Sequence, residues 1–257
     1  MRAKKSLGQH FLKSARALNS IIEAAAIERS DVVLEIGPGT GALTEKLLAN
    51  DCQVLAIEKD DEFYNFLNEK FKKEIANERL ILIHDDILNF KLEAKSYKLV
   101  ANIPYNITGA ILEKFLSAEH QPERMVLLVQ KEVAERIVSR NGKESILSVS
   151  VKAYGNPSYV ETVKAGSFAP APKVDSAILL ITNISKEFFR NFSEKDFFTL
   201  LKTGFSSKRK KLSSNLSQKF AKSDVLTAFQ KLYLDENTRA EELLSTKWRD
   251  LASILCV

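Results

Sequence analysis

The chain of 257 residues has only two cysteines, Cys52 and Cys256, and neither belongs to a Cys-x-x-Cys pair. Two isolated cysteines cannot build a disulfide framework. The three histidines are scattered without metal-ligand spacing, so we predict no metal site. The longest fully apolar runs, 125–129 and 177–181, have the length of strands, whereas a helix that crosses a bilayer needs roughly 20 apolar residues. We therefore expect a cytoplasmic protein that does not enter a membrane.

Positive charge is concentrated in two segments. The net charge of the chain is +5, yet residues 1–16 alone carry +5 and residues 202–222 carry +7, and neither segment contains an acid. The remaining residues therefore sum to −7. Both segments also contain apolar residues, which solvated tails usually lack. This pattern favours two folded basic surfaces that meet a polyanionic partner.

Short β-branched runs alternate with amphipathic stretches from residue 31 to about residue 130. This alternation predicts a parallel sheet with helices on both faces. We expect strands at 32–37, 54–58, 80–84, 98–103 and 125–130. The intervening and following stretches predict helices at 42–50, 61–73, 107–118 and 131–140, the first with a left-handed cap at Asn50.

The regular alternation of strand and helix patterns ends after residue 140. Residues 145–154 fit a helix or a strand, while 159–166 and 176–182 predict strands added in antiparallel fashion at the sheet edge. Beyond about residue 186 only short amphipathic helices are indicated. The predicted fold class is therefore α/β, with a Rossmann-like domain over 1–186 and a small all-helical domain over 187–257.

A glycine loop follows the first expected strand. Gly37, Gly39 and Gly41 occupy alternate positions, where glycine allows a positive φ and lets a ligand lie against the backbone. Glu58 ends the second strand and is placed to accept hydrogen bonds from ribose hydroxyls. Asp86 follows the third strand and can accept from an adenine amino group, with Asp85 as a neighbouring rival. These residues predict a pocket for an adenosine-containing cofactor, either NAD or S-adenosylmethionine.

The sequence Asn-Ile-Pro-Tyr at 102–105 follows the fourth expected strand. It matches the [ND]-x-P-[YFW] signature of enzymes that methylate exocyclic amino groups of nucleobases. The Asn102 side chain and the Ile103 carbonyl can each accept one N6–H of adenine, which directs the nitrogen lone pair at a methyl donor. Tyr105 can stack on a base that has left its stack. Phe168, in a proline-stiffened loop, is a second candidate for stacking.

Taken together, these motifs resemble the small-subunit ribosomal RNA adenine N6-dimethyltransferase family nearly from end to end. The matching segments are KKSLGQHFL (4–12), EIGPGTGALT (35–44), DDIL (85–88), NIPYNIT (102–108), VQKEVAERI (129–137), SFAPAPKVDSA (167–177) and GFSSKRKKLSSNL (204–216).

The resemblance implies a role for each matching residue. His10 and Leu12 would close over S-adenosylmethionine, Gly37 would approach it, Glu58 would bind its ribose and Asp86 its adenine. Asn102 would serve both cofactor and target, and Tyr105 and Phe168 would enclose the target base. Many members have Asn where this chain has His10. The last segment departs slightly from the more usual Arg-Arg-Lys order, and we expect its cations to grip RNA: Lys208, Arg209, Lys210 and Lys211.

The implied reaction is two successive methyl transfers to each of two adjacent adenines near the 3′ end of small-subunit RNA, in an assembling particle, by a monomeric enzyme. A macrolide-resistance methyltransferase that acts on large-subunit RNA would share the glycine loop and the 102–105 motif. A nicotinamide dehydrogenase would share Gly37 and Glu58 but leave that motif unexplained. A non-catalytic assembly factor is the third alternative, and the intact Asn102 argues against it.

Overall fold

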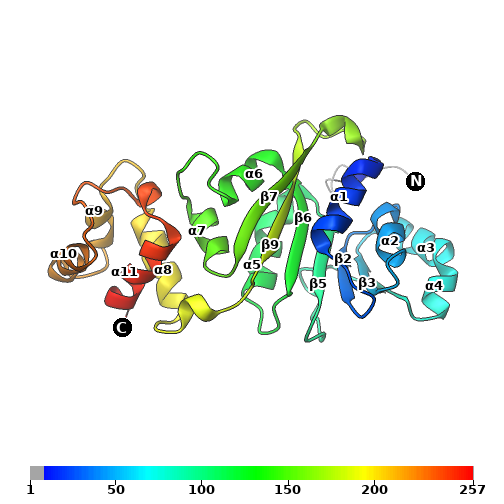
Figure 1. Cartoon of the computed structure of the whole chain (residues 1–257), viewed down its shortest axis with the longest axis horizontal. Coiled ribbons are helices and arrows are strands. Elements are labelled where there is room, and N and C mark those ends of the chain that lie inside the picture. The colour runs from blue at the N-terminus through cyan, green and yellow to red at the C-terminus, as the bar shows by residue number, and fades with distance from the viewer. Residues whose placement is uncertain (1–8, 257) are drawn as a thin grey trace. The chain divides into compact units, whose positions relative to one another are not determined.

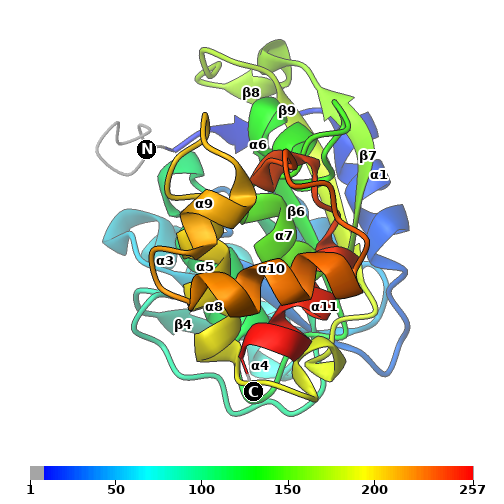
Figure 2. The same ribbon diagram turned by 90° about the vertical axis from the view of Figure 1, so that its left-hand side faces the viewer.

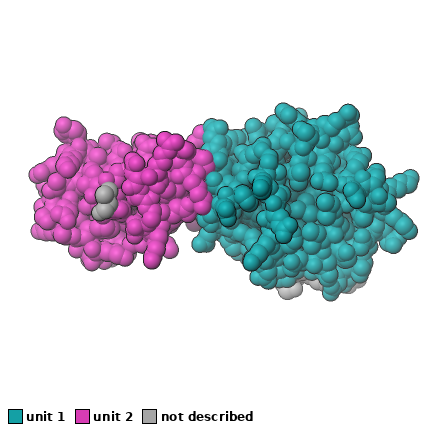
Figure 3. All heavy atoms as spheres, turned by 90° about the horizontal axis from the view of Figure 1, so that it is seen from below, with its two compact units in different colours: residues 1–134, 157–184 teal, residues 135–156, 185–257 magenta. Residues whose placement is uncertain are grey.

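The structure is a computed structural model that describes residues 9–256 (Figure 1). The basic residues expected at Arg2, Lys4 and Lys5 lie outside the described residues. The chain forms two compact units, the first from 1–134 and 157–184 and the second from 135–156 and 185–257 (Figure 3). The predicted division near residue 186 lies close to the last of these boundaries. The sequence did not predict that residues 135–156 also belong to the second unit.

A seven-stranded sheet with the order β4-β3-β2-β5-β6-β9-β7 forms the centre of the first unit. The strands are β2 (Val32–Ile36), β3 (Gln53–Glu58), β4 (Leu80–His84), β5 (Lys98–Asn102), β6 (Arg124–Gln130), β7 (Asn156–Val163) and β9 (Ser176–Thr182). The first five pair in parallel, and β9 is antiparallel to β6. This confirms the predicted parallel sheet and the antiparallel addition. The chain crosses over between β2 and β5, so the carboxyl ends of β2, β3 and β5 meet at a switch point.

The helices of the first unit include the predicted ones and also α1, which the sequence analysis did not predict. They are α1 (Ala15–Ala25), α2 (Ala42–Leu48), α3 (Asp61–Lys70), α4 (Lys72–Ala76), α5 (Thr108–Leu116) and the first part of α6 (Lys131–Ile137). In Figure 1, α1 lies on the viewer's side of the sheet and α5 behind it. The single helix expected over 61–73 is divided at Phe71. The left-handed residue after α2 is Asp51, with φ 58°, and not Asn50 as predicted.

A short ribbon stands apart from the main sheet. β1 (Phe11–Leu12) pairs in antiparallel fashion with β8 (Phe168–Ala169), so that Leu12 faces Phe168 and Phe11 faces Ala169. Single turns of 3-10 helix lie at Tyr105–Ile107, Ala165–Ser167, Glu187–Phe189 and Ala240–Glu242.

The second unit is helical among its described residues. Its elements are α7 (Ile146–Lys152), α8 (Glu194–Gly204), α9 (Leu212–Leu216), α10 (Lys222–Lys231) and α11 (Ser245–Leu255), with the end of α6. α8 to α11 pack against one another (Figure 2), and Trp248 of α11 is fully buried. The ambiguous segment 145–154 is helical because Ser145 and Ser148 form a reciprocal capping box at its start. No helix within 9–256 is long and apolar enough to cross a bilayer.

Candidate active site

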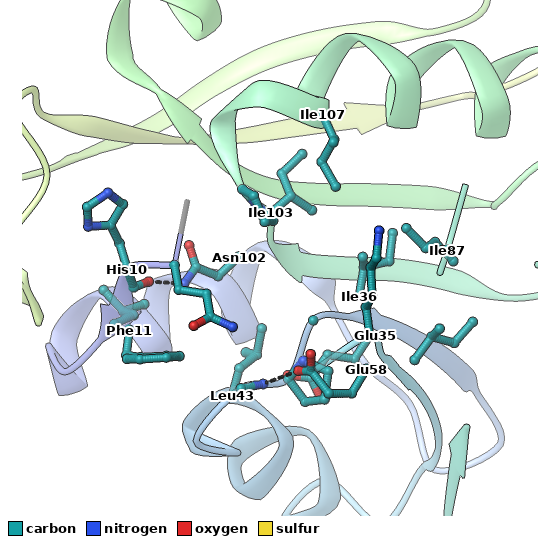
Figure 4. A pocket seen from close by; sticks show the side chains of 18 of the residues that line it. His10, Phe11, Glu35, Ile36, Leu43, Glu58, Ile87, Asn102, Ile103 and Ile107 are labelled. Carbon is teal, nitrogen blue, oxygen red and sulfur yellow. Dashed lines mark hydrogen bonds between the residues drawn. The ribbon is translucent and has the colours of Figure 1, made fainter. Parts of the chain in front are cut away.

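A cavity of about 300 Å³ opens at the carboxyl ends of β2, β3 and β5 (Figure 4). It belongs entirely to the first unit. Its walls come from β1, from the glycine loop and from the turns that follow β3, β4 and β5. The predicted residues that line it are His10, Leu12, Gly37, Glu58, Asp85, Asp86, Asn102 and Tyr105. The structure thus brings together residues that lie far apart in the sequence, at the place where an open parallel sheet binds ligands.

The glycine loop brings backbone to the cavity wall without side chains. Gly37 has φ +64°, and a Cβ atom added there would meet no atom within 4 Å, so that position faces open space. Gly39 has φ +56°, and its Cβ would lie 2.9 Å from the Phe11 ring. An L-residue at Gly39 would be strained in its backbone and would collide with β1. The loop therefore leaves room for a ligand at Gly37 and requires glycine at Gly39.

Glu58 is fixed by two backbone donors at the end of β3. Its Oε2 accepts from the Gly39 N–H at 3.0 Å, and its Oε1 accepts from the Asp60 N–H at 2.9 Å. Burial raises the pKa of this carboxyl, while these hydrogen bonds act in the opposite direction. A carboxylate oxygen has more than one acceptor position, so each oxygen can still accept a ligand hydroxyl. Glu58 therefore fits the two hydroxyls of a ribose.

A second buried acid, Glu35, also lines the cavity and was not among the predicted site residues. Its side chain is 1% exposed, and Oε2 accepts the Thr44 hydroxyl proton at 2.7 Å. Burial, reinforced by the charge of Glu58, raises the pKa of Glu35 to about 8. The sequence signal for this residue is an acid inside an otherwise apolar strand run, a position that is rarely tolerated without a role or a partner.

Asp86 is paired with Lys59, which follows the neighbouring strand β3 and also lines the cavity. Lys59 Nζ lies 2.8 Å from Asp86 Oδ2, and the Leu88 N–H donates to Asp86 Oδ1 at 3.0 Å. The Lys59 hydrogen bond holds the pKa of Asp86 below its usual value, so the group is an ionised acceptor. Asp85 also lines the cavity, but its Oδ1 accepts the Asp86 N–H at 2.7 Å. Both acids therefore line the cavity, and Asp86 is the one whose ionised form the Lys59 contact favours.

Asn102 ends β5 with its side-chain amide in a defined orientation. Its Nδ2 donates to the backbone carbonyl of His10 at 3.0 Å, the dashed line between these residues in Figure 4. This bond uses the amide as a donor, so Oδ1 is the atom that remains to accept. Oδ1 forms no hydrogen bond with any residue of 9–256. Ile103 follows in the cavity wall, and Pro104, which has no N–H, turns the chain.

Tyr105 presents an aromatic ring at the same edge. Its hydroxyl lies 2.6 Å from Ser176 Oγ on β9, and burial raises the pKa of the phenol. The His10 ring stacks on the Tyr105 ring with a centroid distance of 5.9 Å and an interplanar angle of 24°. His10 Nδ1 lies 2.8 Å from the Pro170 carbonyl oxygen. His10 is therefore held between Tyr105 and the loop after β8, with its ring on the aromatic side of the cavity.

Phe168 lies in the ribbon of β1 and β8. Its side chain is 4% exposed, packs in the hydrophobic core of the first unit and does not line the cavity. The reason is the ribbon, in which Phe168 pairs with Leu12 and both side chains are buried. In this arrangement the His10 ring stacks on Tyr105, and the stacking role of Phe168 stays a prediction.

The predicted RNA-binding cations lie in the second unit. All four are exposed, and none forms an ion pair with another residue of 9–256: Lys208, Arg209, Lys210 and Lys211. They belong to the segment 205–211 between α8 and α9, which we call the basic loop. Four exposed cations over four consecutive residues form a patch of positive charge, and the charge of Lys208 also contributes to lowering the pKa of Glu241.

This fold and this site define a methyltransferase of the Rossmann-like class. The overall structure is similar to a dimethyladenosine transferase from Plasmodium falciparum, with a TM-score of 0.81 and 30% identity over 94% of this chain and 96% of that one. The 23S rRNA methyltransferase ErmE shares the fold, with a TM-score of 0.78 and 24% identity over 95% of this chain and 99% of that one.

The sequence comparisons identify the family. A protein of Dehalococcoides mccartyi called ribosomal RNA small subunit methyltransferase A is 45% identical over 98% of this chain and 88% of its own length. The protein of the same name from a Nostoc species is 37% identical over 100% and 99%. Residues 1–256 match the ribosomal RNA adenine dimethylase family, and the chain belongs to that family. The resemblance inferred from the sequence motifs is confirmed.

Proposed function

We propose that this protein uses S-adenosylmethionine to dimethylate the N6 amines of two adjacent adenosines near the 3′ end of small-subunit ribosomal RNA. The observation that carries the proposal is the Asn102 amide, whose Nδ2 is bound to the His10 carbonyl so that Oδ1 remains to accept from a substrate. The names of the relatives from Dehalococcoides and Nostoc support the small subunit as the source of the RNA.

The residues of the cavity fit this cofactor. Glu58 is fixed as an acceptor for ribose hydroxyls, and Asp86 is an ionised acceptor for the adenine amine. Gly37 leaves space beside the backbone, and Leu12 forms part of the wall from β1. When bound, S-adenosylmethionine supplies an electrophilic methyl group on a sulfonium. The acidic pair of Glu35 and Glu58 suits a cationic ligand.

The chain's own residues then prepare the nucleophile. The lone pair of an adenine N6 is delocalised into the ring, so the amine is weakly nucleophilic. In our proposal Asn102 Oδ1 and the Ile103 carbonyl accept its two hydrogens and direct the lone pair toward the methyl group. Methyl transfer from the bound cofactor would form the N–C bond and break the S–C bond, and the N6 proton would leave to water. Tyr105, fixed by Ser176, stacks on the adenine that has left its own stack.

The RNA is held outside the cavity by its phosphates. The basic loop offers four exposed cations, and we propose that it grips the RNA of an assembling small-subunit particle. We further propose that the enzyme acts as a monomer and, because its substrate is ribosomal RNA, in the cytoplasm.

A methylation assay tests the proposal. The substrate is small-subunit particles that lack this modification, incubated with S-adenosylmethionine, and the digested nucleosides are identified by mass spectrometry. N6,N6-dimethyladenosine in small-subunit RNA is the expected product. If the protein binds the cofactor but forms the product only with large-subunit RNA, the assigned substrate is wrong. If neither RNA is methylated, the proposed activity is wrong.

A further inference from the structure

One fully buried amide lies directly beneath the basic loop. Asn215, in α9, is 0% exposed, and its Nδ2 donates to the Gly204 carbonyl at 2.6 Å and to the Ser207 carbonyl at 2.9 Å. Gly204 is the last residue of α8, and Ser207 immediately precedes the four cations. A single side chain therefore ties the end of the helix to the start of the charged segment.

The aromatic core of the second unit fixes the same end of the loop. Phe205 stacks on Trp248 with a centroid distance of 5.5 Å and an interplanar angle of 21°. A Cβ atom added at Gly204 would lie 2.3 Å from the Trp248 ring, so this position admits only glycine without rearrangement. At the other end of the loop the Leu212 N–H donates to the Thr238 carbonyl at 2.8 Å. Both ends of the loop are thus anchored, and the cations lie between the anchors.

The Asn215 side chain has one buried polar atom that it does not pair. Its Oδ1 is buried and has no hydrogen-bond partner among residues 9–256. A buried polar atom without a partner destabilises the folded state. An apolar side chain in its place would remove that penalty but would leave the Gly204 and Ser207 carbonyls without this donor. The Asn215 amide therefore fixes the position of the basic loop through these two carbonyls.

We propose that Asn215 is a positioning residue, which holds the basic loop in the conformation that presents Lys208, Arg209, Lys210 and Lys211 to RNA phosphates. The role of the loop in RNA binding rests on the proposed function. The anchoring of the loop by Asn215 does not. A loop fixed before binding loses less conformational freedom when RNA binds, so the same charges give a higher affinity.

Two measurements in the full-length protein test the geometry without RNA. Trypsin cleaves after Lys and Arg, so each cation of the basic loop is a cleavage site. The rate of limited trypsin digestion there reports the mobility of the loop. We expect Asn215→Ala to be cut in the loop about tenfold faster than the wild type, since two hydrogen bonds are lost. Val225→Ala, which removes core volume from α10 but no hydrogen bond, is the matched control and should be cut in the loop at nearly the wild-type rate.

The second measurement needs no variant. In the wild type the Lys210 and Leu212 amides donate to the carbonyls of Ser207 and Thr238, so their hydrogen exchange should be slower than in an unstructured peptide. Exchange at the rate of a free peptide would show that the loop is not held, and would overturn the inference even if Asn215→Ala does not fold.

Binding to small-subunit particles then tests whether the position of the loop matters for RNA binding. We expect Asn215→Ala to weaken binding about tenfold with an unchanged affinity for S-adenosylmethionine, while Val225→Ala binds as the wild type does. Equal binding by Asn215→Ala and the wild type would overturn the positioning role. If replacing all four cations by alanine also leaves binding unchanged, the RNA site itself was wrongly proposed, and the digestion result still decides whether Asn215 holds the loop.

Discussion

The cavity and the basic loop, the two proposed functional regions, each have one asparagine that donates to backbone carbonyls, and the two asparagines differ in what surrounds them. Asn102 and Asn215 both commit Nδ2 to backbone carbonyls. Asn102 lies in a cavity wall, so its unused Oδ1 is available to a ligand. Asn215 is fully buried, so its Oδ1 reaches neither water nor ligand. The same local device therefore orients a reacting group in one unit and a charged loop in the other.

The largest expected effect separates chemistry from binding. Asn102→Ala removes the Oδ1 acceptor and the anchor to the His10 carbonyl, so kcat for methylation should fall by about 10²–10³. Affinity for the RNA particle should not change, because the cations lie in the second unit. The measurement is single-turnover methylation beside particle binding. Asn65→Ala, an exposed change on α3, is the control. Substantial activity in Asn102→Ala would contradict the proposed mechanism.

The opposite pattern is expected from the basic loop. Replacing Lys208, Arg209, Lys210 and Lys211 by alanine should weaken particle binding by about 10²-fold at low salt and leave cofactor affinity unchanged. Each phosphate contact contributes about 0.7–0.9 unit to the slope of log K against log salt, so removal of four contacts should make this slope shallower by about three. Titrations at several salt concentrations measure it. An unchanged slope would exclude these residues as phosphate contacts.

Two substitutions of Tyr105 separate the contribution of its ring from that of its hydroxyl. Stacking on a base is worth about 1–3 kcal/mol, so Tyr105→Ala should lower kcat/KM for RNA by about tenfold or more. Tyr105→Phe keeps the ring and removes only the hydroxyl beside Ser176, so we expect a loss of a few-fold. Steady-state kinetics with RNA measure both. Equal losses in the two variants would show that the hydroxyl, and not the ring, is required.

The smallest expected effect is a pH dependence of cofactor affinity. The pKa of Glu35 is raised to about 8, so the ligand-free pocket holds a proton at neutral pH. A sulfonium favours the ionised carboxyl, so its binding releases that proton, and affinity should rise a few-fold from pH 6 to 8. Calorimetry in two buffers of different ionisation enthalpy measures the release. S-adenosylhomocysteine, which lacks the sulfonium, should show less release, and Glu35→Gln should show none.

The same group affects stability in a defined direction. Its pKa is raised in the folded state, so the folded protein keeps a proton that the unfolded chain loses above pH 4.5. The free energy of unfolding should therefore fall as the pH rises from 4.5 toward 8, by at most about 1.4 kcal/mol per unit. Urea unfolding of the ligand-free protein should show this slope, and Glu35→Gln should flatten it. A wild-type slope in Glu35→Gln would assign the effect to another group.

The cavity was largely predictable because strand order determines it. Parallel strands place their carboxyl ends together, so Gly37, Glu58, Asp86 and Asn102 had to meet once the strands were recognised. The motif spacing also identified the residues that follow each strand. The site residues that follow the regular strands could therefore be predicted from the sequence alone.

The remaining features depend on tertiary contacts that leave no periodic signal. Phe168 is buried because a two-residue ribbon turns it toward Leu12, and no pattern of that length is readable. The segment 135–156 leaves the first unit although the sheet continues after it. Asn215 resembles any polar residue of a short helix until the carbonyls of Gly204 and Ser207 are seen beside it.

The ribbon of β1 and β8 has a consequence for the order of events during synthesis. Phe11 and Leu12 form part of the cavity wall but pair with residues 168–169, which leave the ribosome long after them. Asn102 in turn is oriented by the carbonyl of His10, which the same ribbon holds in place. Contacts so distant in sequence form late, because the intervening chain must be ordered first. A nascent chain that ends before β8 therefore has the glycine loop and Asn102 but no completed binding site.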